Sequence, residues 1–442
     1  MTTMTTASLP PGPTLPPFLQ GLQFAFRALP FFETCRRRYG DCFTISMPFG
    51  PPYVLFTAPA AVREIFTGDD DDLQAGEANV VLRPLLGVNS VLFLDGDRHA
   101  RERRLMLPPF HGERMLAYAD TMRAITDDVL DRWPVGRPFP IHPEMQAITL
   151  EIILRAVFGL EAGALAVLRD LLRRWIASAL NPLLLWPLLQ VDFGRMSPWG
   201  RLLRLKREID ALLLAEIARR REAGAGERAD VLSLLLAARD EEGRPMRDEE
   251  LLDEMITLLV AGHETTATAL AWTFHHLLAN PDVLEACRAE ARGSSGGFAQ
   301  LPLLDAVVKE TLRLNPVITE VGRRLTRPMR IGGRDIPADV AVGPCIYLVH
   351  RRPDVWPDPE RFDPARFVGT RPSPYEFLPF GGGSRRCLGM AFALYEMKVV
   401  LATVLGRAEL VRAPGYQMRV VRRSITMAPS RGMPVVVTAR AA

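Results

Sequence analysis

The chain has 442 residues, of which 48% are hydrophobic and 24% charged, a balance typical of a soluble globular protein. Its 54 Lys and Arg residues nearly balance its 51 Asp and Glu residues, so bulk charge does not indicate a nucleic-acid-binding protein. The five cysteines are odd in number and lack CxxC spacing, which favours a reducing compartment. Since neither a long apolar run nor a signal-peptide pattern is present, we expect a cytoplasmic protein without a membrane span.

The chain begins with residues 1–20, which are predicted to form an extended arm. Two β-rich runs follow, Cys42–Met47 and Tyr53–Thr57, and the Pro- and Gly-containing segment between them predicts a hairpin. From Pro59 to about Pro316, apolar residues recur three and four positions apart, which predicts helices almost throughout.

The clearest predicted helix begins at Asp248, taken as its N-cap, and ends at Ala279 before an Asn-Pro stop. A helix over residues 248–279 measures about 48 Å at 1.5 Å per residue, so it must cross the whole molecule. After Pro316 the pattern changes to short strands, one further helix and terminal β structure (Ile331–Ile336, Val340–Val349, Leu388–Leu405 and Val420–Ala439). No repeat or linker divides the chain, so residues 1–442 are predicted to form one domain, mainly α with a small β region.

The strongest chemical signal is a glycine-dense loop over residues 380–389, which brings Cys387 to the start of an apolar helix. Glycines permit positive φ and the close approach of a flat partner to the backbone. The free amides and positive dipole of a helix N-terminus favour a thiolate, which suits an axial ligand of haem iron. A lone cysteine is more often a buried free thiol at a tight turn, so the loop by itself leaves both interpretations open.

The spacing Phe-Gly-x-Gly-x-Arg-x-Cys-x-Gly in this loop resembles the haem-ligand loop of the cytochromes P450, the haem-thiolate monooxygenases. Three further motifs match in the same order, so the resemblance covers nearly the whole chain. It implies the triangular P450 fold, one haem b with its iron ligated by Cys387, and cofactor contacts from Phe380, Gly381 and Gly389.

A second motif, at residues 309–313, places Glu310 and Arg313 three residues apart on one helix face, where they can pair. On an exposed face such a pair would contribute only tenths of a kcal/mol. The resemblance implies instead a buried pair, joined by an arginine from a proline-rich segment, that forms a scaffold behind the haem. The Phe-x-Pro-x-Arg-Phe spacing favours Arg366 as this third member, with Arg361 as the alternative.

A third motif lies midway along the long predicted helix, from Ala261 to Thr266. Glycine beside hydroxyl residues weakens the backbone ladder, and the apolar residues on both sides argue against a solvated turn. The motif resembles the family's acid–alcohol pair over the distal face of the haem, which also places Ala261 against the cofactor. The resemblance implies that Thr265 holds water at the iron and that Glu264 relays protons. His263 is disfavoured as a second ligand because the matching family position is variable.

A fourth motif spans residues 97–104, where His99 and Arg103 lie four apart and suit two donors to one anionic group. The alternative is a charged solvated helix face. The resemblance assigns His99 and Arg103 to the haem propionates, together with Arg385 and Arg323. Arg324 is the alternative to Arg323.

Two further expectations concern residues outside these motifs. His350 fits a family position with a structural role. Arg101 and Arg104 cannot both share the propionate-facing side of their helix, so at least some are expected to point outward and to form, with Arg386, a basic patch that steers an acidic ferredoxin. The alternative is that these arginines only pair with neighbours such as Glu102.

The resemblance implies a monooxygenase that inserts one atom of O2 into a hydrophobic substrate by hydroxylation or epoxidation. Electrons would pass from NAD(P)H through a separate ferredoxin or flavodoxin and its reductase to a monomeric protein. A non-oxygenating member of the fold and a haem-based sensor are the two other classes, and the Glu264–Thr265 pair counts against the sensor. The predicted pocket segments are mostly aliphatic and suit a fatty acid, terpenoid, steroid or polyketide (residues 76–94, 180–191, 260–266, 317–321 and 424–428).

Overall fold

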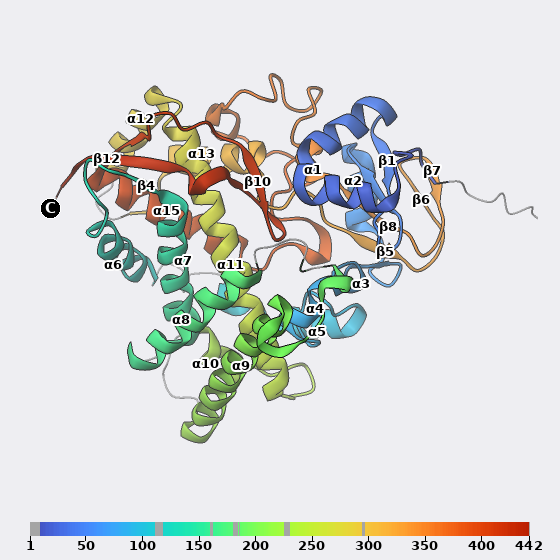
Figure 1. Cartoon of the computed structure of the whole chain (residues 1–442), viewed down its shortest axis with the longest axis horizontal. Coiled ribbons are helices and arrows are strands. Elements are labelled where there is room, and N and C mark those ends of the chain that lie inside the picture. The colour runs from blue at the N-terminus through green and yellow to red at the C-terminus, as the bar shows by residue number, and fades with distance from the viewer. Residues whose placement is uncertain are drawn as a thin grey trace, which may run out of the picture.

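The computed structural model describes residues 9–110, 118–159, 162–179, 184, 186–224, 230–293 and 297–441. Figure 1 shows a broad lobe of helices, with the N-terminal helices and a group of strands together on one side. The fold is therefore mainly α with a small β region, as the hydrophobic periodicity predicted. Among the described residues, no helix combines the length and apolar character that a membrane crossing requires.

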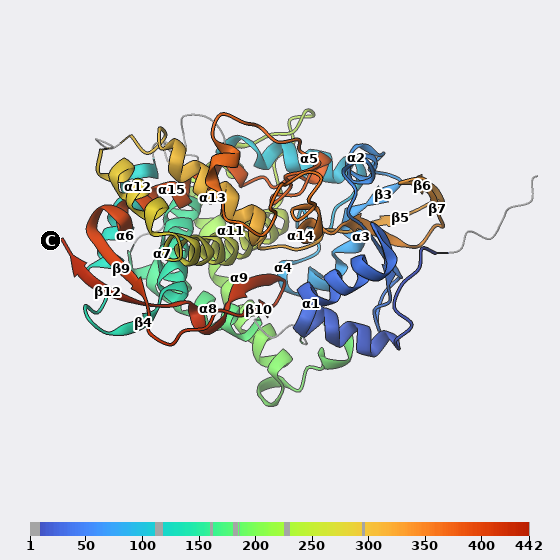
Figure 2. The same cartoon turned by 90° about the horizontal axis from the view of Figure 1, so that it is seen from above.

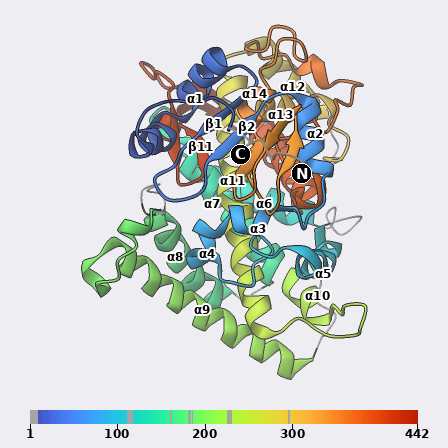
Figure 3. The same ribbon diagram turned by 90° about the vertical axis from the view of Figure 1, so that its right-hand side faces the viewer.

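The helices fill most of the span in which the periodicity predicts them. They are α1 (Pro17–Tyr39), α2 (Pro59–Thr67), α3 (Ala75–Ala78), α4 (Arg83–Leu86), α5 (Gly96–Met106), α6 (Ala119–Leu130), α7 (Ile141–Phe158), α8 (Ala162–Ala179), α9 (Pro198–Ala223), α10 (Val231–Ala237), α11 (Asp248–Leu277), α12 (Pro281–Gly293), α13 (Pro302–Leu314), α14 (Ile346–Val349) and α15 (Met390–Arg407). Figure 3 shows α8, α9 and α10 gathered at one end of the molecule, away from α1 and α2.

The strands form one five-stranded sheet and three smaller sheets. The five-stranded sheet has the order β1-β2-β8-β5-β3, and the others are β10-β11, β4-β12-β9 and β6-β7. Their bounds are β1 (Cys42–Ile45), β2 (Tyr53–Phe56), β3 (Leu73–Gln74), β4 (Pro138–Pro140), β5 (Arg323–Leu325), β6 (Met329–Ile331), β7 (Arg334–Ile336), β8 (Ala341–Pro344), β9 (Ala408–Arg412), β10 (Val420–Arg423), β11 (Thr426–Pro429) and β12 (Pro434–Arg440).

Three predicted elements differ from the structure. The extended arm predicted for residues 1–20 is wrong from Pro17 onward, where α1 begins, because the fixed φ of proline suits a first helical turn. Residues 1–8 of the predicted arm lie outside the described residues. The predicted strand Val340–Val349 is only half correct, since β8 ends at Pro344 and α14 follows. The short strands β3 and β4 lie inside the region predicted to be helical, where each adds an edge to a sheet formed by distant parts of the chain.

Helix α11 crosses the centre of the molecule (Figure 2) and packs along α7. It has 30 residues and a length of about 45 Å, and it ends two residues before the predicted end. Its N-cap is Arg247 rather than Asp248, and the Glu250 carboxylate accepts the Arg247 backbone N–H at 2.9 Å. The helix is buried along most of its length, apart from a few residues in its middle that are exposed or half-buried.

Candidate active site

Cys387 lies in a tight loop between the single 3-10 turn Gly383–Arg385 and α15. Its backbone N–H donates to the Phe380 carbonyl at 3.0 Å, which closes the loop on itself. The other four cysteines are buried, and only the Cys387 side chain is exposed (Cys35, Cys42, Cys287 and Cys345). The loop therefore presents one sulfur atom to a ligand, while Phe380 packs against the main hydrophobic core.

Glycines give this loop its shape. Gly381 and Gly383 both have φ of +66°, in the left-handed region that favours glycine. A Cβ atom on Gly382 would lie 2.2 Å from the Phe66 ring, and one on Gly383 would lie 2.3 Å from the Phe66 carbonyl oxygen. The loop backbone thus packs directly on the end of α2. At Gly389 a Cβ would meet nothing within 4 Å, so steric crowding by the protein does not require glycine there.

The sequence predicted that the helix N-terminus would favour a Cys387 thiolate, but the structure favours the protonated thiol. Although the Cys387 residue retains exposed surface, the protein atoms packed around its thiol desolvate it and raise its pKa. The Gly389 backbone N–H and the Arg103 and Arg386 side chains only partly oppose this effect. The helix α15 begins at Met390, so Cys387 precedes the first helical turn instead of opening it. The helix dipole alone therefore does not produce a thiolate. Because a cysteine ligand must be deprotonated, loss of this proton would accompany metal coordination.

The middle of α11 presents Ala261 and Thr265 on one face, a single turn apart. Ala261 is exposed and Thr265 half-buried, whereas the following helical segment is buried. The Thr265 hydroxyl donates to the Ala261 carbonyl, and the helix continues without interruption through this turn. The predicted weakening of the backbone hydrogen bonds therefore produces no break in α11. The accessible face of the helix carries the small side chain of Ala261 and the hydroxyl of Thr265.

Glu264 and His263 point to other neighbours. The Glu264 carboxylate accepts hydrogen bonds from Gln146 on α7 and from Arg423 Nε at 3.2 Å. Burial raises the pKa of the Glu264 carboxyl group, whereas the charge of Arg423 and the hydrogen bonds from Gln146 and Arg423 lower it. His263 is buried against Thr149, at 3.0 Å, and burial lowers its pKa to about 3. The His263 ring is engaged by α7, away from the face that carries Ala261 and Thr265.

Four basic side chains from three parts of the chain converge near the Cys387 loop. His99 is buried beside Arg385, Arg103 and Arg323, and burial together with these three cations lowers its pKa to about 4. Burial and the neighbouring Arg385 likewise lower the pKa of Arg323 to about 10. Since Arg324 is half-buried and pairs with Glu77 and Asp339, the structure brings Arg323, not Arg324, into this cluster.

Arg385 is the best anchored member of this cationic cluster. It donates to the Leu94 carbonyl at 2.6 Å and to the Asp95 carboxylate at 2.5 Å. Its Nε atom is buried and has no acceptor among the residues that the structure describes. A buried guanidinium N–H beside two other guanidinium groups, those of Arg103 and Arg323, fits an anionic ligand, because burying like charges without one is costly. The cluster therefore fits the propionates of haem, and the accessible Cys387 sulfur fits its iron.

Glu310, Arg313 and Arg366 lie together beneath this site. Arg313 and Glu310 are fully buried and form a two-pronged ion pair at 2.7 and 2.8 Å. Arg366 Nε lies 3.5 Å from the Glu310 carboxylate, whereas Arg361 contributes only its carbonyl oxygen to Arg313. His350 is also buried, accepts the Leu378 N–H at 2.9 Å and offers its carbonyl to Arg313.

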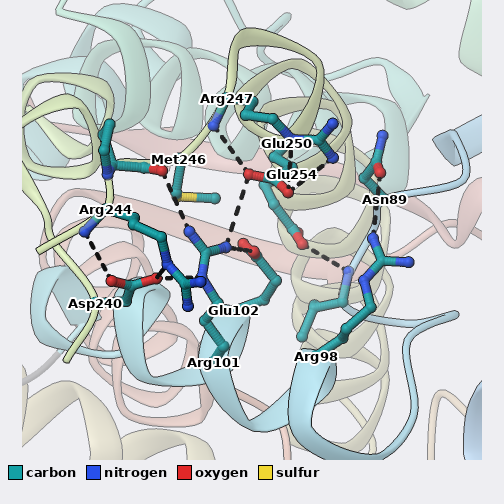
Figure 4. A network of polar contacts seen from close by, with 12 residues as sticks. Asn89, Arg98, Arg101, Glu102, Asp240, Arg244, Met246, Arg247, Glu250 and Glu254 are labelled. Carbon is teal, nitrogen blue, oxygen red and sulfur yellow. Dashed lines mark hydrogen bonds and ion pairs between the residues drawn. The ribbon is translucent and has the colours of Figure 1, made fainter. Parts of the chain in front are cut away.

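Of the arginines expected to form an outward patch, Arg104 and Arg386 are exposed, whereas Arg101 turns inward. Arg101 and Arg104 both pair with carboxylates, as the alternative interpretation expected. Figure 4 shows Arg101 directed at Asp240, with Glu102 and Glu250 on its other side. Arg101 Nε donates to Asp240 at 2.7 Å, so this guanidinium joins α5 to the segment before α11. Arg104 is exposed, but it pairs with Glu241.

Within the part of the chain that the structure describes, hydrogen bonds join some of the predicted pocket segments to one another or to α11. Met427 N donates to the Val317 carbonyl at 2.9 Å, which joins two of the segments. Thr257 Oγ1 donates to Ser90 Oγ at 2.7 Å, which ties a third to α11. Residues 180–183 and 185 of the remaining segment lie outside the described residues.

Sequence reasoning did not identify Asp95, Gln146 or Arg423, which contact predicted site residues. Each is paired with a partner more than 100 positions away, at a separation that no local spacing reveals. Only the neighbouring Arg422-Arg423 pair, placed on a terminal strand beside an expected pocket segment, carries a weak signal in the sequence.

Comparison with known proteins agrees with this geometry. The sequence profile of the Cytochrome P450 family matches residues 10–434. The proteins named cytochrome P450 135B1 of Mycobacterium tuberculosis and Mycobacterium bovis are 43% identical over 441 residues, covering 98% of this chain and 92% of theirs. Cytochrome P450 138 of Mycobacterium tuberculosis is 38% identical, covering 99% of both chains.

Solved structures show the same fold. The structure titled "Retinoic acid bound cyanobacterial CYP120A1" superposes with a TM-score of 0.87 at 27% identity, covering 98% of this chain and all of that chain. The haem domain of cytochrome P450DA gives a TM-score of 0.85 at 25% identity, covering 98% of both chains.

The chain belongs to the cytochrome P450 family. It is accordingly a monooxygenase, an oxidoreductase of the haem-thiolate class that uses O2.

Proposed function

We propose that this monooxygenase inserts one oxygen atom from O2 into a hydrophobic small molecule, such as a fatty acid, terpenoid, steroid or polyketide, by hydroxylation or epoxidation. The observation that carries the proposal is the single exposed cysteine, Cys387, in a loop shaped by left-handed glycines. Bound haem would supply the reduction and cleavage of O2. The mostly aliphatic pocket segments support an apolar substrate.

The residues around this centre have separate roles in the proposal. Cys387 ligates the iron, and His99, Arg103, Arg323 and Arg385 neutralise the propionates. Phe380, Gly381, Gly389 and Ala261 complete the surface against which the ring rests. Glu310, Arg313 and Arg366 hold the backbone of the proline-rich segment, as their buried contacts support.

Two residues of α11 deliver protons in this proposal. The Thr265 hydroxyl donates to the Ala261 carbonyl and so keeps its lone pairs directed at the accessible face. There it would orient a water molecule. Glu264 is the adjacent acid, and it would pass protons toward that water and recover them from solvent.

Electrons come from outside the chain in this proposal. NAD(P)H would supply them through a ferredoxin or flavodoxin and its reductase to a monomeric protein. We place these partners in the cytoplasm, because all five cysteines are free thiols. Supplying a reductase, a ferredoxin and isotopically labelled O2 tests this route, since a product without one labelled oxygen would point to a non-oxygenating member of the fold.

The ligand assignment is tested by substitution of each cysteine. In the reduced carbon monoxide complex, wild type should show the long-wavelength Soret band that thiolate ligation produces. Cys387→Ser should lose this band, while Cys35→Ser, Cys42→Ser, Cys287→Ser and Cys345→Ser should keep it. Loss of the band in one of the buried-cysteine variants, with retention in Cys387→Ser, would overturn the assignment.

A further inference from the structure

A buried polar cluster surrounds Glu264 where α11, α7 and the β10–β11 hairpin meet. Arg423 Nε donates to Glu264 Oε1 at 3.2 Å, and Gln146 donates to Oε2. His142 Nε2 lies 3.9 Å from Oε1 and 3.2 Å from the Thr268 hydroxyl. Both oxygens of the carboxylate are therefore held by side chains of other elements, one of which is an arginine that no sequence motif singled out.

We propose that Arg423 is a positioning residue that holds the Glu264 carboxylate and sets the pH range over which it takes up and releases protons. The proposal rests on the relay role of Glu264 in the proposed function. Arg423 itself touches neither substrate nor cofactor in this scheme. It acts on the reaction through Glu264.

The charges around Glu264 single out Arg423. Burial raises the pKa of Glu264, and Arg423 is the cation that opposes burial. His142 faces the same carboxylate from α7, but burial and Arg423 lower its pKa to about 3, so it is neutral at physiological pH. His263 on α11 is neutral for the same reason. With Gln146 uncharged, the ionised state of Glu264 depends mainly on one guanidinium.

The proton balance of the relay assigns different tasks to the two side chains. The Glu264 carboxylic acid gives up its proton toward the water beside Thr265, and the resulting carboxylate is stabilised by Arg423. The carboxylate then recovers a proton from solvent, and the acid form returns. A guanidinium stays charged throughout, so it is not the carrier. The Arg423 side chain is 28% exposed against 11% for Glu264, so solvent meets the ion pair on the Arg423 side.

The hairpin holds Arg423 in place. Arg423 is the last residue of β10 and pairs with Thr426, whose hydroxyl donates to the Arg423 carbonyl at 2.9 Å. Between these two residues Ser424 has a φ of +55°, which makes the turn tight. The Trp272 indole N–H on α11 donates to the Met427 carbonyl at 2.8 Å and fixes β11 to the same helix that carries Glu264. The guanidinium and the carboxylate are thus presented by two elements that are themselves joined.

The test follows the protonation of Glu264 directly in the holoenzyme. In infrared difference spectra recorded against pH, the carboxylic acid band that is absent from Glu264→Gln reports this residue. We expect its titration midpoint to move upward by about one pH unit in Arg423→Gln, because a neighbouring cation holds a carboxyl pKa down by about one to three units. Arg423→Lys keeps the charge and should restore much of the wild-type midpoint. Arg419→Gln removes an exposed arginine just before the same hairpin and serves as the control.

A second readout connects the titration with turnover. The fraction of electrons that ends in product should show a pH midpoint that moves with the infrared band in Arg423→Gln and returns in Arg423→Lys. An infrared midpoint that is identical in wild type and Arg423→Gln overturns the proposal. If Glu264→Gln leaves the product fraction unchanged, the relay itself is wrong. If the reduced carbon monoxide complex of the wild-type protein lacks the long-wavelength Soret band, the proposed function itself fails, and this outcome is distinct from failure of the Arg423 proposal.

Discussion

Replacing Asp253 with alanine should free the loop Gly87–Val91 from α11. The Asp253 carboxylate accepts the Asn89 backbone N–H at 2.9 Å and its side-chain amide at 3.0 Å. Gly87, with φ of +90°, lies so close that a Cβ there would be 1.8 Å from Asp253 Oδ1. The next residue of the helix, Glu254, accepts the Val91 N–H at 2.6 Å. The loop is therefore bound to α11 through two consecutive carboxyl groups and through the Thr257 hydroxyl, which donates to Ser90.

The size of the effect follows from these contacts. A hydrogen bond to a charged group contributes about 1.5–3 kcal/mol. Burial of the Asp253 carboxylate, which raises its pKa, offsets part of the two bonds to Asn89. We therefore count the two bonds as one and expect the free energy of loop opening to fall by about 1.5–3 kcal/mol. This loss corresponds to roughly 10- to 100-fold faster hydrogen exchange at the backbone amides of the loop.

Hydrogen exchange measured by mass spectrometry on peptides covering residues 86–93 checks this prediction. Exchange in Asp253→Ala should accelerate by that factor, while peptides from α13 keep their wild-type rates. Glu249→Ala, an exposed carboxylate one turn earlier on the same helix, is the matched control and should change nothing. If Asp253→Ala exchanges at the wild-type rate, the two bonds to Asn89 do not hold the loop.

Three further predictions test other parts of the site. Thr265→Ala should still bind haem but release hydrogen peroxide in place of product, because the hydroxyl that orients water is lost; unchanged product per NADPH consumed would remove Thr265 from the mechanism. Arg313→Lys replaces a fully buried guanidinium that makes two bonds to Glu310 and three to backbone carbonyls. It should destabilise the protein by about 3–5 kcal/mol, which would lower both the thermal midpoint and the haem content. A thermal midpoint equal to that of wild type would contradict this prediction. Burial raises the pKa of the Glu254 carboxyl group well above its usual range, so the folded protein binds the carboxyl proton more tightly than the unfolded chain does. This tighter binding stabilises the folded protein, and the stabilisation is lost as pH rises through the folded-state pKa. Glu254→Gln should therefore gain thermal stability relative to wild type as pH rises, whereas a constant difference would show that Glu254 does not titrate in this way.

The sequence predicted those features that depend on local spacing. The pairing of Glu310 with Arg313 and the placement of Cys387 in a glycine loop follow from residues within ten positions of each other. The length of α11 was predicted within two residues, because a buried helix carries a long and continuous periodicity.

Contacts between distant segments were not predictable in this way. Arg101 was one of two arginines expected to supply an outward patch, but its partner Asp240 lies 139 positions away in a loop that folds back over α5. The same holds for Arg423 and Glu264, 159 positions apart. The helix α14 was missed because its four residues, Ile346–Val349, are apolar and partly β-branched, so that short range reads equally well as a buried strand.

The close packing of the Cys387 loop on α2 has a consequence for recombining this protein with its relatives. Phe66 touches the backbone at Gly382 and Gly383 so closely that neither position accepts a side chain. Ser384 also donates to Asp70, just beyond the same helix, at 2.6 Å. Two stretches more than 300 residues apart therefore form one inherited unit. A chimera whose crossover falls anywhere between them would combine an α2 terminus from one parent with a ligand loop from another, and would have to preserve this fit to keep the sulfur in place.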